Sequence, residues 1–141
     1  TEAPTTEAPT TEAPVTEAPT SDLGQQIANF ACQFVGNPYV WGGTSLTNGA
    51  DCSGFVQSVY KNFGYSLPRT CTPQSNAGTA VSLAALAPGD LVFYDHGTGS
   101  CEHVGIYIGN GQIVHASSSR TGIKISNVNY STPFKACRIV N

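Results

Sequence analysis

The chain has 141 residues, which suits one ordinary domain, and a formal net charge of −3. Four glutamates in the first 20 residues contribute −4, so the remaining residues sum to +1 and carry no basic stripe for nucleic acid. No apolar run reaches about 18 residues, so we expect no membrane insertion.

Residues 1–20 repeat a five-residue TEAPT unit with a proline in each copy. Only one aliphatic side chain larger than alanine occurs there, so this stretch cannot bury enough surface to offset its ordering entropy. We therefore expect a disordered linker over 1–20 and one folded domain over 21–141.

Five cysteines, no methionine and little lysine are typical of an exported protein, in which disulfides persist. An odd number of cysteines allows two disulfides and leaves one thiol over. No CxxC or HExxH spacing is present, so we expect neither a metal site nor a cofactor.

The first predicted helix begins at Asp22, which can form a capping box with Gln25, and stops before Gly36 and Pro38. Its apolar face comprises Leu23, Ile27, Phe30, Ala31 and Phe34. A loop rich in glycine and aromatic residues, 37–43, follows it.

A second helical pattern places a cysteine where a loop becomes a helix. Apolar residues recur at helical spacing (Phe55, Val56, Val59, Tyr60 and Phe63), and Gly64 can close the helix. Cys52 then lies in the first turn, where free N–H groups and the macrodipole favour a thiolate. The alternative is a small buried residue or half of a disulfide.

The residue pattern in the second half of the chain predicts β structure. A loop over 67–78 and a turn at 88–90 precede a buried strand over 91–94, and further strands are expected at 103–109, 112–116, 123–125 and 138–140. Helices followed by a run of strands predict an α+β domain with N-terminal helices packed on a central antiparallel sheet.

The hairpin around Asn110 places two histidines. A two-residue Asn-Gly turn would put His103 and His115 on opposite faces, whereas a three-residue Gly-Asn-Gly loop would pair Ile106 with Val114 and put both histidines on one face. We favour the second register, because it gathers the aliphatic side chains on the other face.

Two histidines beside a thiol at a helix start fit a cysteine peptidase, in which a thiol, a base and a group that orients the base act together. Cys52, His103 and His115 fill these roles in that order. The N–H of Cys52 and the Tyr39 hydroxyl are candidate oxyanion donors. The third histidine, His96, is interpreted as a surface residue.

Six ordered segments carry a resemblance to a known family. These are NPYVWGG at 37–43, DCSGFV at 51–56, LPRT at 67–70, PGDLVFY at 88–94, HVGIYIGNG at 103–111 and HAS at 115–117. In order and spacing they resemble the NlpC-type cell-wall cysteine peptidases, a branch of the papain-like fold. The resemblance covers residues 22–141.

The resemblance implies a secreted or cell-surface endopeptidase that cuts peptidoglycan stem peptides between γ-D-glutamate and the following diamino acid. We expect a monomer. It implies that Cys52 is the nucleophile, His103 the base and His115 the orienting residue. Tyr39 would assist the oxyanion, and the substrate-binding residues would be Trp41, Asp51 and Ser53, with Asp51 meeting a substrate amino group. The alternatives are a thiol amidase or acyltransferase on this fold, or a non-catalytic wall-binding or adhesion module.

Two positions depart from the family pattern. Cys71 stands where serine is common, so Cys71 and Cys101 are candidates for a disulfide that would leave Cys32 with Cys137, although four cysteines allow three connectivities. Glu102 replaces a small residue before His103. Its charge would raise the pKa of the histidine or repel an acidic stem peptide.

Overall fold

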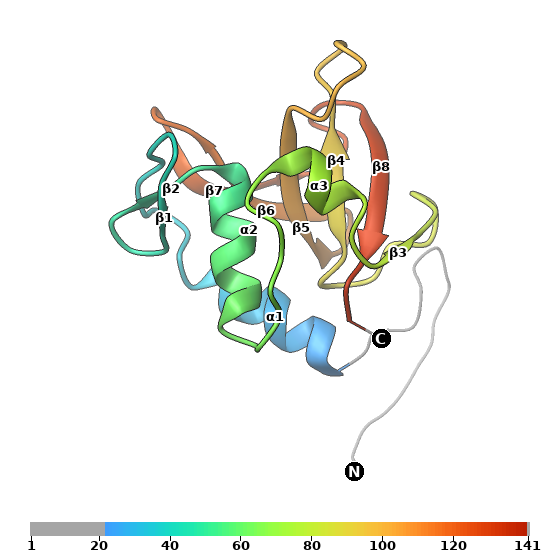
Figure 1. Ribbon diagram of the computed structural model, residues 1–141, viewed down its shortest axis with the longest axis horizontal. Coiled ribbons are helices and arrows are strands. Elements are labelled where there is room, and N and C mark those ends of the chain that lie inside the picture. Colours follow the sequence, from blue (N-terminus) through green and yellow to red (C-terminus); the bar gives the residue numbers. More distant parts are fainter. Residues whose placement is uncertain (1–21, 141) are drawn as a thin grey trace.

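The computed structural model describes residues 22–140 (Figure 1). The predicted linker over 1–20 lies outside the described residues, and the domain boundary at residue 21 stays a prediction. No helix in the described range is long and apolar enough to cross a membrane. The elements are α1 (Asp22–Cys32), β1 (Thr44–Ser45), β2 (Gly49–Ala50), α2 (Cys52–Lys61), α3 (Cys71–Ser75), β3 (Thr79–Ala80), β4 (Leu91–Tyr94), β5 (His103–Gly109), β6 (Gln112–Ser118), β7 (Gly122–Asn127) and β8 (Pro133–Arg138).

Six strands form one sheet in the order β3-β8-β4-β5-β6-β7, and every neighbouring pair is antiparallel. Helices α1 and α2 pack against β5 and β6 at the centre of this sheet (Figure 1). The predicted α+β domain, with N-terminal helices on a central antiparallel sheet, is therefore confirmed.

The two faces of the sheet bury different side chains. On the helix side, Val104, Ile106 and Val114 join the fully buried Phe55 and other apolar residues of α2 in the main core. On the other side, a smaller cluster forms around Val92, Tyr94, Tyr107 and Ile113. Alternation along β5 thus separates an aliphatic face from the face that carries the histidines.

The hairpin has the predicted register, but a different turn produces it. Ile106 pairs with Val114, as expected, while Gly109 pairs with Gln112 across a two-residue Asn110-Gly111 turn. Both turn residues have positive φ, 55° and 75°, as a tight hairpin turn requires. A bulge between Tyr107 and Gly109 adds one residue to β5 and so restores the alternation.

Several predicted boundaries are wrong. The first helix ends at Cys32 rather than reaching Phe34, and the strand expected at 138–140 lies earlier, in β8. The expected loop over 67–78 contains the short helix α3, which follows Thr70 as its N-cap. Pro73 is the third residue of α3, where its missing N–H costs no intrahelical hydrogen bond.

The disulfide pairing of the cysteines agrees only in part with the prediction. Cys71 and Cys101 form a disulfide, whereas Cys32, Cys52 and Cys137 are free, so the expected pairing of Cys32 with Cys137 is wrong. Cys32 lies half-buried at the end of α1, and the buried Cys137 donates to the carbonyl oxygen of Gln74 at 3.5 Å. Three free thiols mean that counting cysteines does not single out Cys52.

A Gly54→Ala substitution tests how closely α2 approaches the preceding loop. Alanine in a helix normally gains about 1 kcal/mol over glycine. Here, however, a Cβ would lie 2.1 Å from the Gly43 oxygen and 2.8 Å from Asp51 Oδ1. We expect the free energy of unfolding to fall by about 1–3 kcal/mol in urea titration. Lys61→Ala, on the exposed end of α2, is the control; a stabilised Gly54→Ala protein would contradict the close contact.

Candidate active site

Asp51 caps the N-terminus of α2 and joins three segments of the chain. As the N-cap, its Oδ1 accepts from the Gly54 N–H at 2.7 Å, and its Oδ2 accepts from the Gly42 N–H at 3.0 Å. Arg69 donates to both oxygens at 3.0 Å. Burial raises the pKa of Asp51. The hydrogen bonds from Arg69 and from the two backbone amides together lower this pKa by more than burial raises it, so the net shift is downward.

Cys52 is the first residue of α2, as predicted, and lies half-buried beside the start of β5. Burial raises the pKa of its thiol, and the Asp51 carboxylate adds to this. The backbone amides of Val104, Ser53 and Cys52 favour the thiolate but do not outweigh burial. The expectation that the helix start would lower the thiol pKa is therefore wrong, because desolvation is the larger effect.

The two predicted histidines meet, as their shared face requires. His103 Nε2 lies 2.7 Å from His115 Nδ1, and both rings are buried. On the far side, His115 Nε2 lies 2.8 Å from the hydroxyl of Ser126 in β7. If Ser126 accepts from His115 Nε2, then His115 Nδ1 accepts from His103 Nε2, and His103 Nδ1 is left as the nitrogen that can take a proton.

Four rings surround the His103 imidazole. The ring centroids of Tyr94, His96, His115 and Tyr130 lie 5.0–6.4 Å from that of His103. Burial first, and then His115 and His96, lower the pKa of His103 to about 3. Burial and Lys124 lower the pKa of His115 to about 4. Both rings are therefore neutral at pH 7 and can accept a proton only transiently.

His96 is exposed, as predicted, but it also stacks on the His103 imidazole. Its ring lies at 5.8 Å from that of His103 with an interplanar angle of 21°. The backbone turns at φ 50° there, and Asp95 holds the turn by accepting from the N–H groups of Gly97 and Gly99. The period-two pattern could not reveal this contact, because His96 lies in a loop.

Glu102 does not act on His103 as expected. Its side chain is exposed and accepts from the Thr98 hydroxyl at 3.4 Å. The pKa of His103 moves down rather than up, and Glu102 is not among the causes. The prediction that Glu102 raises the histidine pKa is wrong, because burial and neighbouring imidazoles dominate.

The remaining predicted site residues lie around Cys52. Burial, then Cys52, then Asp51 raise the pKa of Tyr39, so its hydroxyl stays protonated near the thiol. Ser53 is buried, and its hydroxyl accepts from Arg69 at 3.0 Å. Trp41 is 86% exposed next to Gly42, whose N–H is bound by Asp51.

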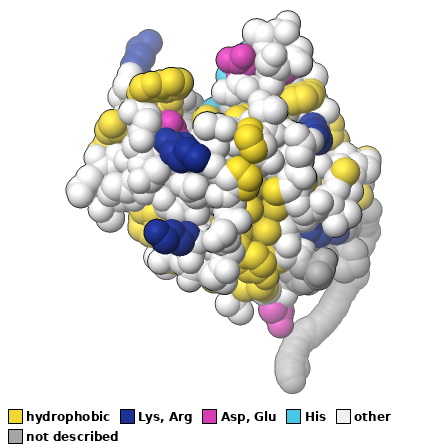
Figure 2. Space-filling view, in the orientation of Figure 1, with side chains coloured by type: hydrophobic (Ala, Val, Ile, Leu, Met, Phe, Trp, Pro, Cys, Tyr) yellow, Lys and Arg dark blue, Asp and Glu magenta, His cyan; other side chains and the backbone are white. Residues whose placement is uncertain are grey.

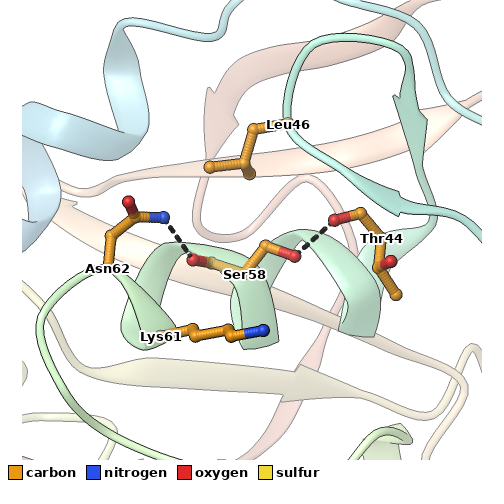
Figure 3. A pocket seen from close by; sticks show the side chains of 5 residues that line it. All are labelled: Thr44, Leu46, Ser58, Lys61 and Asn62. Atoms are coloured by element: carbon orange, nitrogen blue, oxygen red, sulfur yellow. Dashed lines mark hydrogen bonds between the residues drawn. The ribbon is translucent and has the colours of Figure 1, made fainter.

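The surface is hollowed near the histidines. Figure 2 shows histidine atoms inside a notch at the upper edge of this face. A separate pocket lies along the outer side of α2, where the Ser58 hydroxyl donates to the carbonyl oxygen of Thr44 (Figure 3). Its lining contains none of the predicted catalytic or substrate-binding residues.

Three residues of the site escaped sequence reasoning. Ser126 lies in a strand predicted to end at 125, and Tyr130 lies beyond it, so no pattern linked them to the histidines. Arg69 was part of a family motif without an assigned role. The available signal was the arginine of the LPRT motif, 18 residues after Asp51, because a buried carboxylate at an N-cap favours a cationic partner.

The pH dependence of Cys52 alkylation tests whether the Cys52 thiol is neutral at pH 7. Burial raises the pKa of the Cys52 thiol and lowers that of His103 to about 3, so both groups favour their neutral forms at pH 7. We expect the iodoacetamide rate, followed by peptide mapping, to rise steadily through pH 9. Cys32, whose pKa burial also raises, is the comparison within the same sample. A rate plateau at Cys52 across neutral pH would instead reveal a preformed ion pair.

Ser126→Ala tests the chain of contacts from Ser126 through His115 to His103. Without the hydroxyl, nothing fixes the His115 tautomer, and its Nδ1 can carry a proton that opposes the His103 Nε2–H. We expect kcat to fall by on the order of tenfold with KM nearly unchanged. Ser118→Ala is the control, because Ser118 lies in β6 but its hydroxyl contacts Thr121. Its kcat should equal that of the parent. Equal kcat values for the two variants would exclude a role for Ser126.

Comparison with known proteins identifies relatives of the whole site-bearing region. The family model described as "NlpC/P60 family" matches residues 36–140. A Bacillus cereus protein named γ-D-glutamyl-L-lysine dipeptidyl-peptidase is 42% identical over 105 residues, which cover 73% of this chain and 31% of the relative. The chain thus spans about a third of that relative's length.

Solved structures agree with this result. The structure of an NlpC/P60 family protein from Bacillus cereus is 36% identical with a TM-score of 0.78, over 89% of this chain and 43% of the other. The NlpC/p60 domain of the peptidoglycan hydrolase SagA is also 36% identical, with a TM-score of 0.73, over 81% of this chain and 97% of the other. The chain therefore belongs to the NlpC/P60 family.

Proposed function

We propose that this domain is a cysteine endopeptidase that hydrolyses peptidoglycan stem peptides at the bond between γ-D-glutamate and the following diamino acid. The observation that carries the proposal is the 2.7 Å contact between His103 Nε2 in β5 and His115 Nδ1 in β6, the two strands against which the Cys52 helix α2 packs. A thiol, a base and an orienting group are the three parts that such a hydrolysis needs.

In the proposed mechanism, the reaction starts from a neutral pair. As Cys52 Sγ attacks the carbonyl carbon, His103 Nδ1 takes the thiol proton, and His115 supports the imidazolium from behind. The developing oxyanion is directed to the Cys52 N–H, which has no intrahelical acceptor, and to the Tyr39 hydroxyl. His103 then returns the proton to the leaving amine, and water releases the acyl group from sulfur.

The names of the relatives support the choice of substrate. One is named for the γ-D-glutamyl-L-lysine bond, and another is called a peptidoglycan hydrolase. Trp41, Asp51 and Ser53 are proposed to line the substrate side of Cys52. The Asp51 carboxylate is only 10% exposed and already binds Arg69, so it would offer a substrate ammonium group one edge rather than a free carboxylate.

The setting of the enzyme follows from its substrate. A peptidoglycan hydrolase meets its substrate outside the cell membrane, so the domain is proposed to be secreted or held at the cell surface. The TEAPT repeats over 1–20 would then serve as a spacer. A monomer suffices, because each proposed catalytic group comes from the same chain.

Replacing the nucleophile tests this function. Cys52→Ala should release no cleaved stem peptides from purified cell walls, a loss of at least about a thousandfold, because no other group can form the acyl-enzyme. Cys32→Ala, which removes another half-buried free thiol, should keep the parent rate. Mass spectrometry of the products separates an endopeptidase from an amidase. Parent-like release by Cys52→Ala, or no release by the parent, would reject the proposal.

A further inference from the structure

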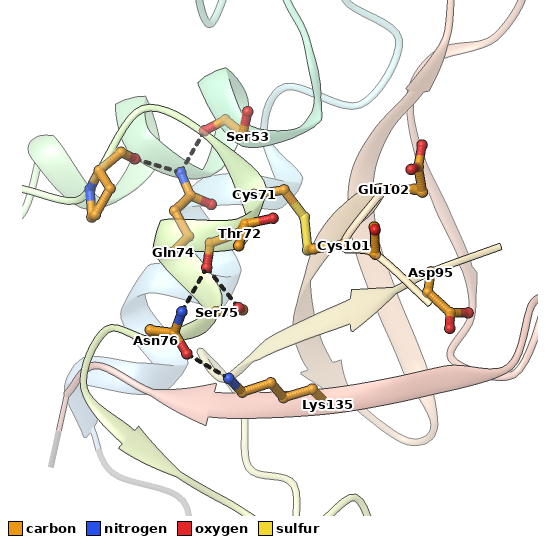
Figure 4. Close-up of a disulfide and its surroundings, with 12 residues drawn as sticks. Ser53, Cys71, Thr72, Gln74, Ser75, Asn76, Asp95, Cys101, Glu102 and Lys135 are labelled. Carbon is orange, nitrogen blue, oxygen red and sulfur yellow. Dashed lines mark hydrogen bonds between the residues drawn. A yellow bond between two sulfur atoms is a disulfide. The ribbon is translucent and has the colours of Figure 1, made fainter. Parts of the chain in front are cut away.

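The short helix α3 contacts both layers that carry the proposed catalytic pair. From inside α3, the Gln74 side chain reaches the first turn of α2, where Nε2 donates to the Ser53 carbonyl oxygen at 3.0 Å (Figure 4). At its start, Cys71 is bonded to Cys101, two residues before His103 (Figure 4). The helix therefore connects the residue after Cys52 with the segment entering β5.

The Gln74 amide can take only one orientation. Its Nε2 also donates to the Pro68 carbonyl oxygen at 2.8 Å, so both neighbours of this atom are acceptors. A flipped amide would place oxygen against two carbonyl oxygens, which is repulsive. The correct orientation leaves Gln74 Oε1 buried without a hydrogen-bond partner among residues 22–140.

The amide satisfies two carbonyl oxygens with Nε2 while leaving its own Oε1 without a partner, which costs free energy. What the amide adds is a fixed distance: it links the Ser53 carbonyl to the Pro68 carbonyl, next to the Arg69 that binds Asp51. Both ends of this link set the position of the first turn of α2.

We propose that Gln74 is a positioning residue for Cys52, and that α3 braces the nucleophile turn of α2 against the segment that carries His103 through the Gln74 amide and the Cys71–Cys101 disulfide. The proposal rests on the proposed function for its kinetic consequence. Its geometric consequence concerns only the environment of the Cys52 thiol.

The test replaces the amide without changing side-chain length. Gln74→Met removes both hydrogen bonds, and Gln57→Met is the matched control, because Gln57 Nε2 donates to the carbonyl oxygen of Leu67 in the same loop at 3.0 Å, whereas Gln74 Nε2 donates to the Ser53 carbonyl oxygen. Displacement of a reacting group by about 1 Å can cost about a hundredfold in rate. We expect Gln74→Met to lower kcat at least about tenfold with KM within about twofold, and Gln57→Met to keep both values.

Alkylation of Cys52 by iodoacetamide supplies a readout that needs no substrate. Moving the first turn of α2 weakens the amide contacts that favour the thiolate, so the Gln74→Met rate at pH 8 should fall several-fold while Gln57→Met stays at the parent rate. If the parent cleaves no stem peptide, the proposed function fails, but this comparison still decides the positioning role. Equal alkylation and equal kcat in the two variants would overturn the brace, as would a lower melting temperature with kcat unchanged.

If Gln74→Met does not yield folded protein, the Cys71–Cys101 disulfide at the other end of α3 provides a second test of the proposal. The double variant Cys71→Ser/Cys101→Ser leaves the amide in place and removes the covalent tie to the His103 segment. We expect the same pattern: reduced kcat, nearly unchanged KM and slower Cys52 alkylation. Parent-like values for this double variant would overturn the proposal.

Discussion

Three segments of the chain meet at the carboxylate of Asp51, and the geometry of the site depends on that meeting. The side chain caps α2, binds the Gly42 N–H of the aromatic loop and pairs with both terminal nitrogens of Arg69. A carboxylate buried in this way is stable only with such partners. Because Cys52 is the next residue, the contacts that satisfy Asp51 also determine where the thiol lies.

The second half of the site is organised by the pleat of the sheet. Alternation along β5 and β6 sends aliphatic side chains to the helices and both histidines to the opposite face. The tyrosine-rich side of the sheet then buries the imidazoles and keeps them neutral. Burial thus favours the neutral form of both groups, because desolvation raises the pKa of the Cys52 thiol and lowers that of the His103 imidazole.

Local periodicity was sufficient for the parts of the site that lie on regular elements. The helical spacing after Cys52 and the two-residue period around Asn110 predicted where Cys52, His103 and His115 lie. Contacts made by loops and by separate strands could not be predicted this way: His96 stacks from a turn, Ser126 approaches from β7, and the pairing of cysteines depends on tertiary distances. The thiol pKa was misjudged because sequence reveals a helix start but not its desolvation.

The identity of the cleaved bond tests the account most directly. A synthetic stem peptide of L-alanine, γ-linked D-glutamate, a diamino acid and D-alanine can be incubated with the parent domain and analysed by mass spectrometry. The account predicts two fragments, L-alanyl-D-glutamate and the diamino acid joined to D-alanine. An intact peptide, or cleavage at any other bond, would contradict it.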